Sequence, residues 1–156
     1  MSATYQAVMA TPFGALGIRC NERAVTGIDF LPAGTPLLAP VNSIAAQACA
    51  ELQSYLDDPA HRFHVPTELH GTSYQRKVWQ VIAGIPAAQP VSYGELASRI
   101  GSSPRAVGQA CGANPIPIVI PCHRVLAKGG LGGFMHSRGS GPLDIKQWLL
   151  RHEAGE

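Results

Sequence analysis

One of the four cysteines lies among residues that could make it a nucleophile. Cys122 follows a proline and is followed directly by His123 and Arg124. An imidazole can accept a thiol proton, and nearby positive charge lowers the pKa of a thiol, so this pattern predicts a reactive thiolate. The alternative is a buried, inert thiol, which is the commonest state of a cysteine in a cytosolic protein.

A carboxylate that could complete this arrangement lies near the end of the chain. Glu153 continues the apolar face of a helix predicted to begin at residues 140–142, and a charge on such a face needs a partner, because desolvating an unpaired carboxylate is costly. If His123 is that partner, Glu153 would orient the imidazole, and His123 would draw the thiol proton directly or through a water. We favour the water, because adjacent side chains rarely point at each other. A salt bridge from Glu153 to Arg151 or Lys146 is the alternative.

Metal chemistry is not indicated by the remaining candidate ligands. The cysteines at positions 20, 49, 111 and 122 form no Cys-x-x-Cys pair, and no histidines accompany them at zinc-finger spacing. His61 and His64 lie in a polar connection that we expect to be a solvated loop. We therefore expect no metal site, and free thiols in a reducing compartment.

The elements that would position these residues fall into two halves. Residues 4–10, 16–20 and 25–30 read as short strands of a meander, and a helix capped by Asn42 or Ser43 should run to Asp57 and cover one face of the sheet. Residues 1–70 are thus predicted to form a small α/β domain. Because helices dominate the rest, the whole chain is predicted to be an α+β protein.

Residues typical of helix starts and helix ends recur along residues 71–156. A helix should start at Thr72 or Ser73 and end near residue 84, a second should run over residues 93–100 behind a capping box that starts at Ser92, and a third should follow Ser103 and end at Gly112. The last two are short and joined by a tight turn, which makes them a helix-turn-helix candidate.

The third of these helices has few bulky side chains. Arg105, Ala106 and Gly108 open it, and a glycine inside a helix costs about 1 kcal/mol relative to alanine, so a compensating reason is needed. Tight helix packing is one reason. The other is close approach of the backbone to a nucleic-acid groove, with Arg105 projecting toward phosphates or bases. The pattern favours neither.

The charge of the chain is divided unevenly. Residues 1–70 hold three basic and six acidic residues, a net charge of −3, whereas residues 71–156 hold nine basic and four acidic residues, a net charge of +5. A basic half is a weak indication that this part meets a polyanion, and an ordinary solvated surface would look the same.

No long apolar segment interrupts the chain. The longest apolar run, residues 116–120, is far shorter than the roughly 20 residues of a membrane-spanning helix, and its prolines exclude a helix. We expect this segment to be extended and buried, with Cys122 at its end. The first residues show no pattern of a secretory signal, so we expect a cytoplasmic protein without membrane contact.

The segment around the cysteine resembles the active-site signature of the O6-alkylguanine-DNA alkyltransferases, also called methylated-DNA–protein-cysteine methyltransferases. The resemblance rests on Asn114-Pro115 followed by Pro121-Cys122-His123-Arg124-Val125, and it continues in order from about Tyr74 to Glu153. Residues 1–70 resemble the variable N-terminal domain of the family only loosely.

This resemblance implies a fold and a reaction. It implies a ribonuclease H-like N-terminal domain, residues 1–70, and a helical DNA-binding and alkyl-transfer domain with a helix-turn-helix, residues 71–156. By likeness, Cys122 takes an alkyl group irreversibly, and once per molecule, from O6 of a flipped guanine, or O4 of thymine, in double-stranded DNA. No cofactor is implied, and the protein would act as a monomer.

The resemblance also implies roles for individual residues. His123, a water and Glu153 would generate the thiolate, Tyr93 would hydrogen-bond guanine N3 and help to protonate the leaving base, and Asn114 would tie the helix-turn-helix to the active-site loop. Residues implied in DNA binding, besides Tyr93, are Arg105, which fills the vacated stack, Ala106 and Gly108 in the minor groove, and Arg124. Those implied in the substrate pocket are Val125, Phe134, Met135 and Lys146.

One segment departs from the family pattern. The loop between Gly133 and Lys146 is several residues longer than usual, Phe134 stands where tyrosine is common, and Met135 stands where a backbone N–H would contact O6. A lesion-binding relative of the alkyltransferases without transfer activity is therefore an alternative, although such relatives generally lack the cysteine. A turnover thiol hydrolase using Cys122 and His123 is a third hypothesis.

Overall fold

The structure, a computed structural model, describes residues 4–134 and 140–156, and the chain divides into two compact units, residues 1–70 and 71–156. It is a mixed α/β structure with a small antiparallel sheet and five α-helices in its described part. None of the described helices has both the length and the apolar character needed to cross a bilayer.

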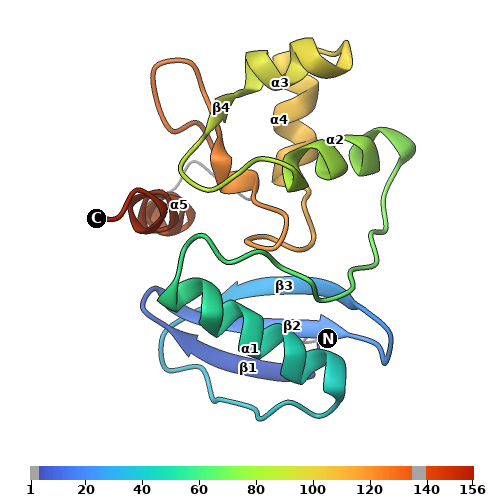
Figure 1. The fold of residues 1–156 in the computed structure, drawn as a ribbon, viewed down its shortest axis with the longest axis vertical. Helices are drawn as coiled ribbons and strands as arrows, with labels where there is room; N and C mark the ends of the chain where they lie inside the picture. Colours follow the sequence, from blue (N-terminus) through green and yellow to red (C-terminus); the bar gives the residue numbers. More distant parts are fainter. Residues whose placement is uncertain (1–3, 135–139) are drawn as a thin grey trace. The chain divides into compact units, whose positions relative to one another are not determined.

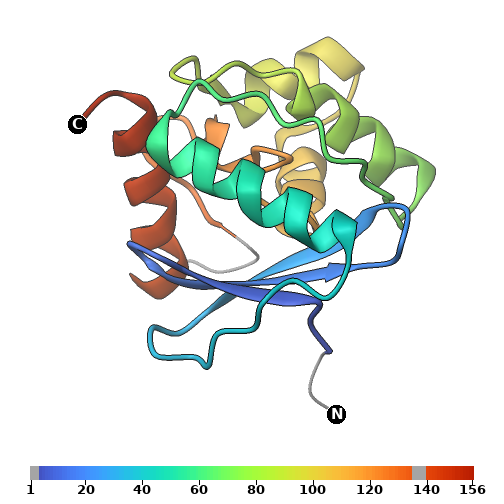
Figure 2. The same cartoon turned by 60° about the horizontal axis from the view of Figure 1, so that its bottom comes forward.

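The first unit is a three-stranded meander covered by one helix. Strands β1 (Ala7–Thr11), β2 (Gly14–Cys20) and β3 (Val25–Leu31) pair antiparallel in that order, and α1 (Ser43–Asp57) lies across one face of the sheet (Figure 2). The side chain of Asn42 caps α1 by accepting a hydrogen bond from the backbone N–H of Ala45. The meander and the helix are confirmed, and only the strand ends differ from the prediction.

Three helices of the second unit begin and end where their caps predict. Helices α2 (Ser73–Ala83), α3 (Tyr93–Ile100) and α4 (Pro104–Gly112) are grouped together in Figure 1, and Thr72, Ser92 and Ser103 cap them. Gly101 ends α3 in the left-handed conformation, with φ of 67°, which allows the tight turn into α4.

A buried tryptophan fixes α2 against α4. The indole N–H of Trp79 donates to the carbonyl of Ala110 at 2.8 Å, and the side chain is almost fully buried. An indole can be buried without penalty only when its N–H finds an acceptor, so this bond sets the depth at which the two helices meet.

A short parallel strand pair joins α3 to the segment that carries the cysteine. Strand β4 (Val91–Ser92) pairs with β5 (Val125–Leu126), so that Val91 lies opposite Val125. The start of α3 and the segment just after Cys122 are therefore held side by side. Helix α5 (Ser140–Glu153) closes the unit.

The segment that leads to the cysteine is buried, as predicted, but it is not extended. Residues 115–121 form a tight loop in which the backbone N–H of Ile120 donates to the carbonyl of Ile116 at 2.9 Å. Ile118 adopts a φ of 74°, a region that a β-branched residue rarely occupies. The prediction of an extended segment was wrong because the prolines exclude a helix without excluding turns.

Replacement of Ser92 by alanine tests the cap that positions Tyr93. Ser92 and Glu95 form a reciprocal capping box at the start of α3. We expect Ser92→Ala to lower the free energy of unfolding by about 1 kcal/mol, measured by urea denaturation. Ser98→Ala, an exposed position inside the same helix, is the matched control and should change stability by less than about 0.5 kcal/mol. Equal effects at both positions would contradict a capping role.

Candidate functional site

The thiol of Cys122 is held by a turn between a loop and a strand. Residues Cys122–Arg124 form a single 3-10 turn (η1), and the backbone N–H of Cys122 donates to the carbonyl of Ile120 at 2.8 Å. Cys122 is 3% exposed. The turn matters because it brings the side chains of two consecutive residues, His123 and Arg124, to the same carboxylate, that of Glu153.

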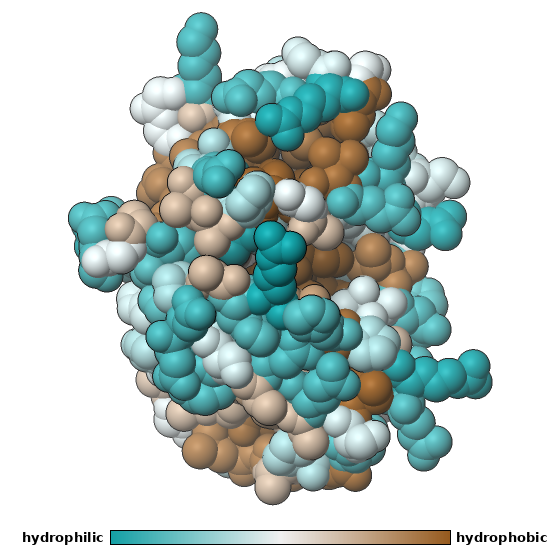
Figure 3. Space-filling view, in the orientation of Figure 1, coloured by the Kyte–Doolittle hydropathy of each residue, from teal (hydrophilic) through white to brown (hydrophobic). Residues whose placement is uncertain are grey.

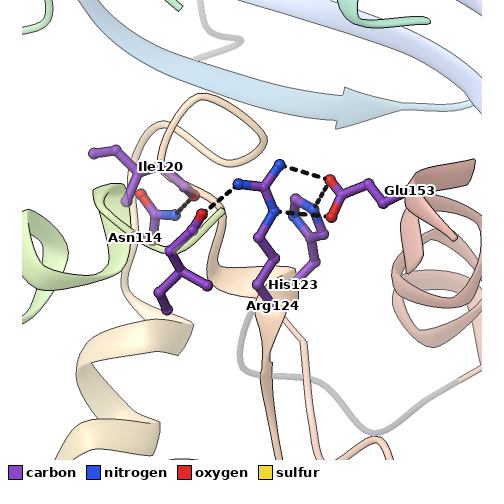
Figure 4. A network of polar contacts seen from close by, with 6 residues as sticks. Asn114, Ile120, His123, Arg124 and Glu153 are labelled. Atoms are coloured by element: carbon purple, nitrogen blue, oxygen red, sulfur yellow. Dashed lines mark hydrogen bonds and ion pairs between the residues drawn. The ribbon is translucent and has the colours of Figure 1, made fainter. Parts of the chain in front are cut away.

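The predicted partnership between His123 and Glu153 is present. The imidazole Nε2 lies 2.6 Å from Oε2 of Glu153, and the two side chains are 0% and 1% exposed. Figure 4 shows the carboxylate reaching from α5 toward the imidazole and the guanidinium of Arg124. The alternative partner Lys146 is engaged elsewhere, and Arg151 is exposed.

Arg124 is buried beside the same carboxylate. Its Nε donates to Oε1 of Glu153 at 2.8 Å and its Nη2 donates to Oε2 at 2.9 Å (Figure 4). Its Nη1 donates to the carbonyl of Ile85 at 2.6 Å. The resemblance implies contact with DNA for this residue. The structure instead places its guanidinium in the interior of the unit, where these three bonds occupy it. Sequence reasoning did not find Ile85, because a backbone acceptor leaves no signal in residue type.

The second ring nitrogen of His123 is open. Burial lowers the pKa of His123, the hydrogen bond and charge of Glu153 oppose this, and the charges of Arg124 and Lys146 lower it further, so the surroundings favour the neutral ring. The short contact with the carboxylate assigns the single ring proton to Nε2. Nδ1 therefore carries the lone pair, and this buried atom has no hydrogen-bond partner within residues 4–134 and 140–156. Nδ1 is thus an atom of this site that could accept a proton.

The thiol itself is not ionised at rest. Burial raises the pKa of Cys122 to about 11, although a hydrogen bond from Asn114 and the charge of Lys146 act in the opposite direction. The prediction of a lowered thiol pKa considered the charge beside the cysteine but not its burial, and burial raises the pKa more than the charge of Lys146 lowers it. A thiolate forms here only when its proton can be passed on.

Asn114 connects α4 with the loop that carries the cysteine. Its side-chain amide donates to the carbonyl of Ile120 at 2.8 Å (Figure 4), and its side-chain oxygen accepts from the N–H of Ile116 at 3.0 Å. Its own N–H donates to the carbonyl of Cys111 in α4. This buried side chain closes both ends of the tight loop, and it also reaches the thiol of Cys122.

Lys146 holds the segment that follows the cysteine turn, residues 125–133, and its charge acts on the thiol of Cys122. Its ammonium is buried and donates to the carbonyls of Val125 at 3.0 Å, Leu131 at 2.6 Å and Gly133 at 2.9 Å. Burial lowers its pKa to about 8. All three ammonium protons thus hold residues 125–133 in place.

The aromatic ring of Tyr93 lies close to Lys146 and to this segment. The ring of Tyr93 lies with its centre 5.9 Å from the Lys146 ammonium, and its hydroxyl contacts the carbonyl of Gly133. Phe134 and Val125 are buried in the same unit. Met135 lies outside the described residues.

The start of α4 presents a cation on an otherwise smooth surface. Arg105 is exposed in the first turn, and Ala106 and Gly108 are half-buried behind it. A Cβ at Gly108 would meet only the ring of Tyr93, at 4.0 Å, so glycine is not required there by close helix packing. In Figure 3, hydrophobic surface lies between protruding hydrophilic side chains over the region of α3 and α4. The loss of bulk in this helix favours close approach by another molecule.

Comparison with known proteins gives a consistent result. Residues 73–155 match the family described as 6-O-methylguanine DNA methyltransferase, DNA binding domain. A methylated-DNA–protein-cysteine methyltransferase of Salmonella typhimurium is 49% identical over 90 residues, which cover 56% of this chain and 50% of that protein. The chain thus spans about half the length of that relative.

Other relatives match along nearly the whole chain. A methylated-DNA–protein-cysteine methyltransferase of Methanosarcina acetivorans is 33% identical over 156 residues, covering 96% of this chain and 97% of that protein. The crystal structure of Mycobacterium tuberculosis OGT in complex with DNA has a TM-score of 0.80 and 31% identity, covering 95% of this chain and 91% of the other. The crystal structure of Mycobacterium tuberculosis O6-methylguanine methyltransferase has a TM-score of 0.81 and 30% identity at the same coverage.

The pH dependence of thiol alkylation tests the buried state of Cys122. Because its pKa is raised to about 11, the thiolate fraction should keep rising about tenfold per pH unit from pH 7 to pH 10. We expect the rate of modification by iodoacetamide, followed by mass spectrometry of the Cys122 peptide, to rise throughout this range. A short blocked peptide with one exposed cysteine, the control, levels off above its ordinary pKa of about 8.5. A plateau at Cys122 by pH 8 would show that the thiolate is already formed at rest.

Proposed function

Because the chain belongs to the methylated-DNA–protein-cysteine methyltransferase family, we propose that it repairs DNA by direct reversal, moving an alkyl group from O6 of guanine, or O4 of thymine, to Cys122. The observation that carries this proposal is the buried pair of His123 and Glu153, which leaves the basic Nδ1 open beside the cysteine turn. No metal or cofactor takes part in the proposed reaction.

The proposed transfer balances without any additional reactant. The proton of the thiol passes through a water to Nδ1 of His123, and Glu153 stabilises the imidazolium that results. Sγ of Cys122 then bonds to the alkyl carbon while the bond from that carbon to O6 breaks. The departing guanine takes up a proton, assisted by the hydroxyl of Tyr93. The thioether is stable, so each molecule acts once.

The substrate base would lie between the cysteine turn and the segment held by Lys146. Backbone carbonyls of Cys122 and Val125 are proposed to accept from the guanine amine, and Tyr93 to donate to N3. Phe134 and Met135 would bound the alkyl group. The three bonds from Lys146 support this assignment, because they hold the segment of residues 125–133, which follows the cysteine turn, in one conformation.

The DNA duplex is proposed to bind at α3 and α4, acting as a helix-turn-helix. The smooth surface of Ala106 and Gly108 suits the narrow minor groove, and Arg105 would enter the stack in place of the flipped base. The charge of +5 on residues 71–156 supports binding to a polyanion. Arg124 is left out of this surface because its guanidinium is bound to Glu153.

The remaining assignments concern the whole protein. Residues 1–70 are proposed to be the ribonuclease H-like domain of the family, and residues 71–156 the DNA-binding and alkyl-transfer domain. A monomer in the cytoplasm is proposed, and the four free cysteines fit a reducing compartment.

A stoichiometric transfer assay tests the proposed reaction. After incubation with a duplex that contains O6-methylguanine, peptide mass spectrometry should find one methyl group, on the Cys122 peptide, and no second turnover. Cys122→Ser should abolish transfer while the protein stays folded. Tight lesion binding without methylation would favour a lesion-binding protein instead, and repeated turnover of an activated ester without a DNA preference would favour a thiol hydrolase.

If Arg105 enters the base stack in place of the flipped base, which we call its finger role, its loss should affect two substrates differently. Only a duplex requires the vacated stack to be filled, so Arg105→Ala should slow transfer from duplex O6-methylguanine by at least about tenfold, equivalent to about 1.4 kcal/mol. Transfer from free O6-benzylguanine should change less than twofold. Arg76→Ala, which removes an exposed cation from α2, is the control for lost charge. Equal losses of Arg105→Ala on both substrates would contradict the finger role.

A further inference from the structure

Tyr74 makes a contact to which the proposed transfer step assigns no role. It lies in the first turn of α2, and its side chain is 36% exposed. Its hydroxyl lies 2.6 Å from the hydroxyl of Ser102, a short distance for a hydrogen bond between two such groups. Because Ser102 lies between α3 and α4, this bond ties the start of α2 to the turn that joins the other two helices.

The turn of residues 101–103 sets where α4 begins. The backbone N–H of Ser102 donates to the carbonyl of Ala97 in α3 at 2.9 Å, and the next residue, Ser103, caps α4. Arg105 follows two positions after this cap and is exposed. A displacement of the turn would therefore carry the cap and Arg105 with it.

Helix α4 is attached to α2 near both of its ends. The indole of Trp79 holds the carbonyl of Ala110 in the last part of α4, and Tyr74 holds Ser102 just before its first turn. A single attachment point fixes the depth of a helix but leaves it free to pivot about that point. Two points, one at each end, also fix its direction.

We propose that the hydroxyl of Tyr74 is a positioning group for DNA binding, which holds Ser102 and thereby fixes the start of α4, and with it Arg105, before a duplex arrives. The inference rests on the proposed function, in which α4 meets the minor groove and Arg105 enters the base stack. A helix that is already oriented loses less conformational freedom when DNA binds, so the affinity is higher. Tyr74 acts through Ser102 and not by touching DNA.

Two substitutions that each remove one oxygen atom test this role. Tyr74→Phe keeps the ring, and Ser102→Ala removes the partner hydroxyl. We expect each to weaken binding to a lesion-free duplex about threefold to tenfold, the range that one hydrogen bond supports, at a single salt concentration. Transfer from free O6-benzylguanine should change less than about twofold, because this substrate does not need α4. Tyr5→Phe, which removes a phenol hydroxyl bonded to Asp29 in the first unit, is the matched control and should leave duplex affinity unchanged.

The double variant separates a tether from two independent contacts with DNA. If the two hydroxyls act only through each other, Tyr74→Phe combined with Ser102→Ala should bind no more weakly than either single variant. Ser102→Thr, which keeps a hydroxyl, should retain the affinity of the unmodified protein. Losses that multiply in the double variant would overturn the proposal, and so would a loss of less than about twofold in both single variants.

Amide hydrogen exchange measures the tether without DNA. The backbone N–H of Val107 donates to the carbonyl of Ser103 at 3.1 Å, so its exchange reports opening of the first turn of α4. Tyr74→Phe should speed this exchange about threefold to tenfold. The buried indole N–H of Trp79, in the same unit, should keep its rate and is the control for overall stability. Equal rates for Val107 in the variant and the unmodified protein would overturn the proposal.

Failure of the proposed function can be told apart from failure of this inference. If Tyr74→Phe loosens the first turn of α4 but the unmodified protein neither binds a duplex nor takes up a methyl group from it, the repair function is rejected and the tether stands. If the unmodified protein binds and is methylated, and both single variants bind DNA as tightly, only the positioning role is rejected.

Discussion

The burial of the Glu153 carboxylate is the constraint on which the second unit depends. An isolated carboxylate in a protein interior costs several kcal/mol, so the fold must supply it with partners. It does so with Arg124 and His123, which are consecutive residues of one short turn, and Arg124 extends the network to Ile85 after α2. One charge thereby fixes α5, η1 and the end of α2 relative to each other. The residues that anchor these segments are also those that could perform the chemistry.

Burial gives the cysteine the opposite character from a typical catalytic thiol. Catalytic cysteines that turn over are usually exposed in part and have lowered pKa values. Cys122 is enclosed and its pKa is raised to about 11, so in the proposed reaction the transfer of its proton to His123 accompanies the attack on substrate. The raised pKa of Cys122, the lowered pKa of His123 and the pairing of Glu153 with Arg124 all follow from burial in a low-dielectric environment.

The sequence predicted the parts of this structure that local chemistry decides. Ser92 and Ser103 cap their helices through bonds to residues three positions on, and such bonds leave a pattern within a few letters. The pairing of His123 with Glu153 was also predictable, because a carboxylate on an apolar helix face demands a partner. The role of Arg124 was not predictable, because it depends on a distant carbonyl. The rise in the pKa of Cys122 was not predictable either, because residue types show nearby charges but not the depth of burial.

The loop before the cysteine shows why the prolines alone could not predict its shape. They remove backbone donors and exclude a helix, yet both an extended strand and a tight turn satisfy them. Asn114 selects the tight turn, because its side chain accepts from the N–H of Ile116 and donates to the carbonyl of Ile120 at the same time. Ile118 is thereby held at a positive φ, a conformation that costs about 1–3 kcal/mol and persists only where its surroundings fix it. Because one buried amide bonds both ends of the strained turn, the turn can form only at these residues. The position of the thiol that follows the turn is fixed as a result.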